Sequence, residues 1–170
     1  MELIEGNTRL RPLRYADRKS LARLANNKKI WNNLRDMFPF PYQFEDAEKF
    51  IESVKNQDPQ VTFAIEFEYK FVGVIGIVLQ HDVYRKSAEI GYWIGEPFWN
   101  HGIVTTAVRL MTTYAFGQLK LKKLFAGIFE GNEGSKKVLE KCGYQLEGIA
   151  RKAVFKNNKF LDEFRYGKLV

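Results

Sequence analysis

The sequence predicts a single domain over residues 1–170, of the α/β class and the α+β type, with a mixed, mostly antiparallel sheet of about seven strands flanked by helices. Three observations predict it. The 170 residues suit one ordinary domain. Segments that alternate apolar and polar residues are interleaved with segments whose apolar residues recur every three or four positions. Their order (strand, helices, three strands, helix, strand, helix, two strands) places a β-α-β unit at the centre of an otherwise antiparallel sheet.

The first third of the chain predicts one strand and three helical segments. Thr8–Leu13 is the strand, and Tyr15–Asn27 is rich in helix formers with apolar residues on one face. A short helical stretch through Ile30–Trp31 ends before Phe38–Tyr42, because a residue before proline is pushed out of the helical region. The third helix carries an apolar stripe made of Phe44, Ala47, Phe50, Ile51 and Val54.

The rest of the chain supplies the other strands and two more helices. Val61–Phe67 and Phe71–Leu79 flank Glu68–Lys70, which we expect to be a hairpin tip. Gly143 follows the last helix as its C′ glycine. The remaining predicted elements, in order, are strand Ser87–Ile94, helix Gly102–Gln118, strand Leu124–Phe129, helix Ser135–Cys142, and a final hairpin of Tyr144–Phe155 and Phe160–Leu169 around the turn Lys156–Lys159.

Composition restricts the classes of function. The 27 basic and 20 acidic residues give a net charge of +7, which favours a polyanionic partner: nucleic acid, an anionic membrane surface or a multiply phosphorylated cofactor. The longest apolar run, Phe71–Leu79, is shorter than the ~20 residues that span a bilayer, and the acidic N-terminus lacks a signal-peptide apolar region. We therefore expect a cytoplasmic protein without a membrane partner. One cysteine excludes an internal disulfide, and His81 and His101 match no zinc-ligand spacing, so no metal is expected.

The most informative segment is Ile94–Ala107, where a strand ends, a turn carries Gly102 and a long helix begins. The first turn of a helix has unpaired N–H groups and a partial positive charge, so it can hold a phosphate with backbone alone. A lone glycine turn is weak evidence for this, and two further features strengthen it. Glu89 and Trp93 share a face of the preceding strand, and the polar cluster Glu130–Ser135 opens the next helix. A right-handed crossover makes these two strand ends neighbours, which predicts a ligand cleft between them.

These segments resemble the GNAT acetyltransferase superfamily, and within it the ribosomal-protein alanine N-acetyltransferases. The resemblance covers nearly the whole chain and rests on the order and spacing of its pieces. It implies the GNAT fold with a splayed central strand pair, acetyl-CoA as co-substrate and an amine acceptor. The pieces are Thr8–Pro12, Phe40–Tyr42 with Glu45–Ala47, Ala88–Ile94, Trp99–Gly102 with Thr105–Ala107, Asn132–Ser135, and Val138–Tyr144 with Glu147–Gly148.

The resemblance also assigns the cofactor contacts. Asn132 and the backbone of Tyr92, Trp93 and Ile94 are expected to bind the pantetheine arm. Two residues depart from the family motif: Trp99 replaces the usual Gln or Arg, and Val104 replaces a small residue. The pyrophosphate is expected on the backbone N–H groups of His101, Gly102, Ile103, Val104 and Thr105.

The resemblance also suggests the catalytic residues. Many family members carry a general-acid Tyr where this chain has Leu139, and Ser135 resembles a serine that the ribosomal-protein branch retains, so the resemblance makes Ser135 the candidate acid. Glu89 is the candidate general base, directly or through a water, because family members often place a carboxylate on this strand. The alternative for Glu89 is an ordinary strand glutamate. An α-amine is about 10–20% neutral at pH 7 and a lysine amine below about 0.1%, so an α-amine needs less help from a base.

We therefore expect an N-acetyltransferase that acts on a protein or peptide N-terminal α-amine. One alternative is a small-molecule amine acetyltransferase, acting on a polyamine or an aminoglycoside. An alternative of another class is a basic, non-catalytic RNA- or ribosome-binding protein, although no RNA-recognition motif is present and a nucleic-acid partner is not expected. Gly131–Lys136 lacks the spacing of a nucleotide-hydrolase phosphate loop, and Cys142 is interpreted as a packing thiol. A homodimer is left open.

Overall fold

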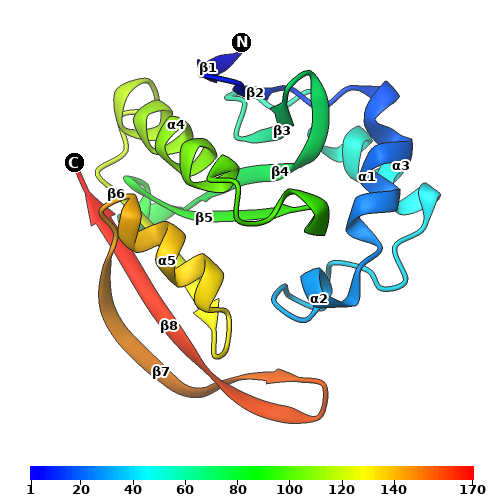
Figure 1. Cartoon of the computed structure of the whole chain (residues 1–170). Helices are drawn as coiled ribbons and strands as arrows, with labels where there is room; N and C mark the ends of the chain where they lie inside the picture. The colour runs from blue at the N-terminus through cyan, green and yellow to red at the C-terminus, as the bar shows by residue number, and fades with distance from the viewer.

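The computed structural model describes residues 1–170, and its strands form one sheet in the order β1-β2-β3-β4-β5-β6-β8-β7 (Figure 1). Every neighbouring pair is antiparallel except β5 and β6, which are parallel and joined through α4. The predicted mixed sheet with a central β-α-β unit is therefore confirmed. The strands are β1 Leu3–Glu5, β2 Thr8–Arg11, β3 Thr62–Phe67, β4 Lys70–Leu79, β5 Ser87–Ile94, β6 Lys123–Phe129, β7 Gln145–Lys156 and β8 Lys159–Leu169.

Five α-helices accompany the sheet. They are α1 Arg18–Ala25, α2 Lys28–Trp31, α3 Phe44–Val54, α4 Ile103–Gly117 and α5 Glu133–Lys141. The chain reverses after α5 through Gly143, at φ +80°, whose N–H bonds to the Glu140 carbonyl while the Tyr144 N–H bonds to that of Leu139. This pattern is the Schellman motif, so the prediction of a C′ glycine is confirmed. None of the helices is both long and apolar enough to cross a membrane.

Two details of the N-terminal region differ from the prediction. The sheet has eight strands rather than about seven, because Leu3–Glu5 forms a short edge strand that pairs with β2. The first α-helix begins at Arg18, and Tyr15–Asp17 before it is a 3-10 turn. The cause of that turn is Asp17, whose carboxylate accepts the Arg14 N–H and two hydrogen bonds from the buried Arg11 guanidinium. Fixing this carboxylate keeps the first turn tight.

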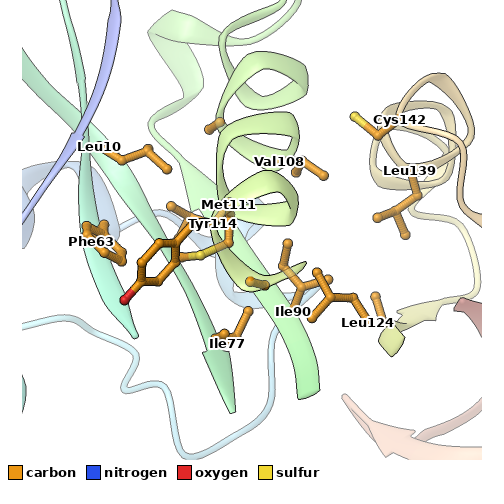
Figure 2. Packing of buried hydrophobic residues seen from close by; sticks show 14 of the residues in the cluster. Leu10, Phe63, Ile77, Ile90, Val108, Met111, Tyr114, Leu124, Leu139 and Cys142 are labelled. Atoms are coloured by element: carbon orange, nitrogen blue, oxygen red, sulfur yellow. The ribbon is translucent and has the colours of Figure 1, made fainter. Parts of the chain in front are cut away.

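The two faces of the sheet carry separate apolar cores. The larger core lies under α4 and α5, where Met111 and Tyr114 of α4 and Leu139 of α5 meet strand residues such as Ile90 (Figure 2). The smaller core packs α1 and α3 against the other face and has at its centre Leu21, Ala47, Ile51 and Val74. Because side chains alternate along β5, Ile90 faces the larger core and Trp93 contacts the smaller one.

The last two strands form a long hairpin that extends past the rest of the sheet (Figure 1). Asn157 and Asn158 at its tip have φ values of +52° and +58°. Two successive left-handed residues define the turn that matches the twist of a two-residue hairpin, and asparagine tolerates that conformation. The predicted turn is confirmed, and it brings the hairpin tip beside α2, where Asn157 donates a hydrogen bond to Asn32.

Candidate active site

The two central parallel strands separate partway along their length, which leaves one edge of β5 without a partner strand. They pair from Ser87 with Lys123 to Glu89 with Phe125, and the pairing then stops. β5 continues to Ile94 with its other edge on β4, while β6 stays paired with β8. The splayed strand pair is thus present. Its free edge over Ile90–Ile94 can hydrogen bond to an extended, amide-containing ligand as a further strand would. Of the three residues expected to bind pantetheine, Tyr92 and Ile94 turn their backbone groups to this edge, whereas those of Trp93 face β4. The Ile94 carbonyl already accepts a hydrogen bond from the Trp99 indole.

The turn between β5 and α4 presents a row of unpaired backbone donors. Gly102 is the N-cap of α4 with φ +74°, and no side chain caps the helix. The first hydrogen bond of the helix runs from the Thr106 N–H to the Gly102 carbonyl, so no N–H group over residues 101–105 has an acceptor within the chain. Val104 packs against the larger core, so its added bulk lies beside α4 rather than over these donors. This geometry fits an anionic group.

Trp99, a departure from the family motif, has a structural role at the same turn. Its indole Nε1 donates to the Ile94 carbonyl at 2.9 Å, and its ring packs against the larger core. The bond closes the connection from the end of β5 to the start of α4. A large aromatic residue at this position therefore fixes the turn that carries Gly102, which the sequence alone did not indicate.

The start of α5 lies beside β5 where the strands separate. Asn132 is the N-cap of α5 and accepts the Ser135 N–H through Oδ1 at 3.3 Å, which leaves its Nδ2 hydrogens free to donate. Tyr92 of β5 donates its hydroxyl hydrogen to the Ser135 carbonyl at 3.4 Å. Burial raises the pKa of the Tyr92 hydroxyl, so it remains a donor at neutral pH. The Ser135 hydroxyl has no partner in the chain.

Glu89 lies on the opposite face of β5 from Tyr92, as the alternation of a strand requires. Its side chain is 22% exposed, and Oε1 accepts a hydrogen bond from Nη2 of Arg35 at 2.5 Å. Arg35 belongs to the segment between α2 and α3. The structure therefore places Ser135 near Tyr92 on one face of β5 and Glu89 on the other face. Their catalytic roles stay predictions.

A buried lysine connects the hairpin tip to the segment that carries Arg35. Lys156 is 3% exposed and its Nζ donates to the Leu34 carbonyl at 2.9 Å and to Asp36 at 2.7 Å. The same ammonium lies 3.4 Å from the centroid of the Trp31 ring, a cation–π geometry. Sequence reasoning assigned Lys156 to the hairpin turn and gave it no partner. No local signal distinguishes it from the other hairpin lysines, because its partners are more than 100 residues away.

An open cavity of about 430 Å³ lies between α2, the β6–α5 loop and the hairpin tip. Eight of its nine lining residues are polar, charged or glycine, and one is apolar. Its polar rim and open shape suit a hydrated, flexible chain better than an apolar small molecule. The lining residues are Lys29, Asn32, Asn33, Glu130, Gly131, Lys156, Asn157, Lys159 and Leu161.

His101 and Cys142, the two other residues considered from the sequence, have clear environments in the structure. The His101 imidazole is exposed, and its turn borders a smaller cavity of about 310 Å³ that also touches the β1–β2 turn. Cys142 is buried, its thiol donates to the Thr105 carbonyl at 3.4 Å, and burial raises the pKa of the thiol. Both properties fit a packing thiol. No group of three or more His, Cys, Asp or Glu side chains is placed to hold a metal ion.

A sheet that splays at its central parallel pair, beside an uncapped helix N-terminus, is the arrangement in which α/β proteins commonly bind ligands at strand ends. Comparison with known proteins identifies the family. Residues 7–145 match the Acetyltransferase (GNAT) domain. The chain belongs to this family, so the expected superfamily and fold are confirmed.

Individual relatives agree with this. The probable N-acetyltransferase YjcK of Bacillus subtilis is 44% identical over 92 residues, which are 52% of this chain and 51% of that protein. The chain thus spans about half the length of the relatives that it matches at this level. The ribosomal-protein-serine acetyltransferase of Escherichia coli is 26% identical over 156 residues, 89% of this chain and 87% of that protein.

A solved structure extends the likeness over the whole fold. The microcin C7 self-immunity acetyltransferase MccE, solved in complex with acetyl-CoA and AMP, superposes with a TM-score of 0.84 at 26% identity. The superposition covers 98% of this chain and 94% of that chain.

Proposed function

We propose that this chain transfers the acetyl group of acetyl-CoA to a primary amine, and that the acceptor is the N-terminal α-amine of a protein or peptide. The single observation that carries the proposal is the splay of β5 from β6 beside the unpaired donors at the start of α4. Acetyl-CoA is an intracellular metabolite, so the proposal carries with it the expectation of a cytoplasmic location.

Features along the splayed strands support binding of the successive parts of acetyl-CoA. The N–H groups of 101–105 suit the pyrophosphate, and Gly102 has open space where a Cβ would lie, so a phosphate oxygen can approach the backbone. The free edge of β5 and the Asn132 amide suit the amides of the pantetheine arm. When bound, the thioester supplies an activated acetyl group.

Residues of this chain can transfer the proton that the reaction moves from the amine to the thiolate. The reaction forms an amide C–N bond, breaks the C–S bond, and moves one proton from the amine to the departing thiolate. Glu89 supports removal of the proton from the amine, and the unpartnered Ser135 hydroxyl supports its delivery to the sulfur. An α-amine of ordinary pKa is already about 10–20% neutral at pH 7, so a modest base is sufficient.

Two observations support a protein N-terminus as the acceptor. One relative, which matches over 89% of this chain and 87% of its own length, is named for a ribosomal protein. The polar cavity beside the hairpin tip is open enough to admit an extended peptide, and it adjoins the segment from which Arg35 contacts Glu89. A polyamine requires carboxylates to hold its several charges, whereas three lysines and one glutamate line this cavity.

Release of free thiol from acetyl-CoA tests the acceptor. The panel contains a peptide with a free N-terminus, the same peptide N-terminally blocked but with an internal lysine, spermidine, an aminoglycoside and no acceptor. We expect release with the free peptide and background release with the blocked one. Faster release with spermidine or the aminoglycoside assigns a small-molecule acceptor instead. RNA that raises the melting temperature where acetyl-CoA does not would support the binding-protein alternative.

A further inference from the structure

The carboxylate of the candidate base Glu89 already forms an ion pair with another residue of the chain, Arg35. The Arg35 guanidinium holds its Oε1 at 2.5 Å, and no other ion pair involves this carboxylate. The two partners differ in exposure: the Arg35 side chain is 61% exposed and that of Glu89 is 22% exposed. Arg35 thus reaches from the surface to a less exposed carboxylate on β5, and its own exposure leaves the side chain free to move back into solvent.

The backbone on either side of Arg35 is held in place. Lys156 bonds to the carbonyl of Leu34 and to the side chain of Asp36, the two residues that flank Arg35. Two positions further on, Phe38 packs edge-on against Trp93 of β5, with ring centroids 5.9 Å apart. The segment is therefore fixed over the same face of β5 that carries Glu89. Because the backbone of this segment is held, the exposed side chain of Arg35 is the part that can move independently.

We propose that Arg35 is a gate that decides which acceptors reach Glu89: its guanidinium occupies the place of the acceptor's ammonium group, and the acceptor enters by displacing it. The inference rests on the proposed function, because it takes Glu89 as the base for an amine. About 80–90% of an α-amine is ammonium at pH 7, so the exchange replaces one cation at the carboxylate with another. A neutral acceptor, such as an alcohol, offers no charge to replace that of Arg35, and the gate selects against it.

The exposure of Arg35 sets the expected size of the effect. Exposed ion pairs contribute little free energy. The form in which Arg35 contacts Glu89 (closed) should therefore be only about 1.4 to 5 times as populated as the form in which it does not (open). Apparent affinity falls in proportion to the open fraction. Removing the gate should therefore lower the KM for the amine by about 2- to 6-fold. The KM for acetyl-CoA and kcat should change less than about 2-fold, because Arg35 has left Glu89 once the acceptor is bound.

The test measures both KM values with a short, C-terminally amidated peptide that has a free N-terminus. Arg35→Met removes the cation and keeps an apolar stem, and Arg35→Lys restores a cation. Arg14→Gln is the matched control: Arg14 is 60% exposed, pairs with Glu2 at 3.5 Å, and lies outside the cleft. We expect the peptide KM to fall in Arg35→Met, to return toward the wild-type value in Arg35→Lys, and to stay unchanged in Arg14→Gln, with all melting temperatures close to that of the wild type.

The measurements separate failure of the proposed function from failure of the Arg35 gate. If the wild-type enzyme acetylates no amine of the panel, the proposed function fails and the gate fails with it. If the wild type is active and Arg35→Met raises the peptide KM, Arg35 holds the acceptor instead of excluding it. An unchanged KM in Arg35→Met, with activity intact, also overturns the gate. Equal falls in Arg35→Met and Arg14→Gln would show a general charge effect and no gate.

Discussion

The Tyr92 hydroxyl of β5 donates to the backbone carbonyl of Ser135 in the first turn of α5, at 3.4 Å. This bond joins the free edge of the splayed strand to the helix that carries the candidate acid. Both ends are held by other contacts: Tyr92 packs against the larger core, and Ser135 is bonded to its N-cap Asn132. The contact therefore sets where the Ser135 hydroxyl lies relative to the strand edge.

Tyr92→Phe should lower kcat by about 2- to 10-fold, with a smaller change in the KM for acetyl-CoA. The phenyl ring retains the packing, and the lost hydrogen bond costs about 0.5–1.5 kcal/mol of stability. Tyr144→Phe is the matched control, because it removes a similar buried side-chain bond, to Thr112 of α4 at 2.8 Å, and leaves the bond from Tyr92 to the Ser135 carbonyl intact. Steady-state kinetics and thermal unfolding check both. Equal kinetic losses in the two variants would mean that stability alone is responsible.

Ser135→Ala should lower turnover with little change in acetyl-CoA affinity, if the hydroxyl protonates the leaving thiolate. The effect should be smaller than that of the glutamate considered below. A thiol of ordinary pKa, about 8.5, leaves tolerably well without a donor. Single-turnover measurement of thiol release and a separate acetyl-CoA titration separate the two effects. A large loss of acetyl-CoA affinity would instead make Ser135 a cofactor-binding residue.

Gly102→Val should weaken acetyl-CoA binding by at least about 10-fold while costing only about 1–2 kcal/mol of stability. The side chain meets open space in the free protein, so the stability loss comes from the left-handed φ of +74°. The affinity loss comes from the isopropyl group, which would stand where the phosphates approach the backbone.

Gly143→Val is the control for that backbone strain. Gly143 has φ +80° and lies at the far end of α5, where a Cβ would meet only the flexible end of Lys168. It should lose similar stability and retain acetyl-CoA affinity in calorimetric titration. Normal affinity in Gly102→Val would remove the pyrophosphate from the start of α4.

Some of these relationships were predictable from sequence. The limits of β5 were predicted to the residue, because Ser87–Ile94 alternates cleanly and ends at a glycine. The three-residue strand β1 was missed, because so short a segment has no periodicity. Glu89 was proposed as the base because family members often place a carboxylate on this strand, and that role stays a prediction. Its partner Arg35 is 54 residues away, and no local pattern encodes that contact. Trp99 was noticed as a departure from the family motif, and that departure was the available signal for its bond to Ile94.

Stability should fall as pH rises above 10, because buried tyrosines resist ionisation. Burial raises the pKa of Tyr144 from 10.0 to about 12. The unfolded chain loses this proton first, so the stabilisation is complete below pH 10 and is lost as pH rises toward 12, by roughly 2–3 kcal/mol. Denaturant unfolding at pH 9 and pH 11 measures the fall. Tyr144→Phe should be less stable at pH 9 but should show a smaller drop between the two pH values; an equal drop would contradict the assignment.

Glu89→Gln should lower turnover on a free N-terminus by about 10²- to 10⁴-fold at neutral pH, the usual contribution of a positioned proton acceptor. The amide retains an oxygen that can accept from Arg35, so the local fold should be preserved. The deficit should shrink as pH rises from 7 to 9, because the amine then loses its proton to solvent before it binds.

Glu147→Gln is the matched control for the loss of one carboxylate, since Glu147 of the edge strand β7 pairs with Lys123 at 2.7 Å and makes no contact with Arg35. It should turn over like the wild type at every pH. Rates at saturating acetyl-CoA, measured from pH 6 to pH 9 on both variants, make the comparison. If Glu89→Gln keeps near-normal turnover across this range, Glu89 is an ordinary strand glutamate held by Arg35. Catalysis would then rest on positioning the thioester against the small neutral fraction of an α-amine, which favours an N-terminal acceptor over lysine or a polyamine.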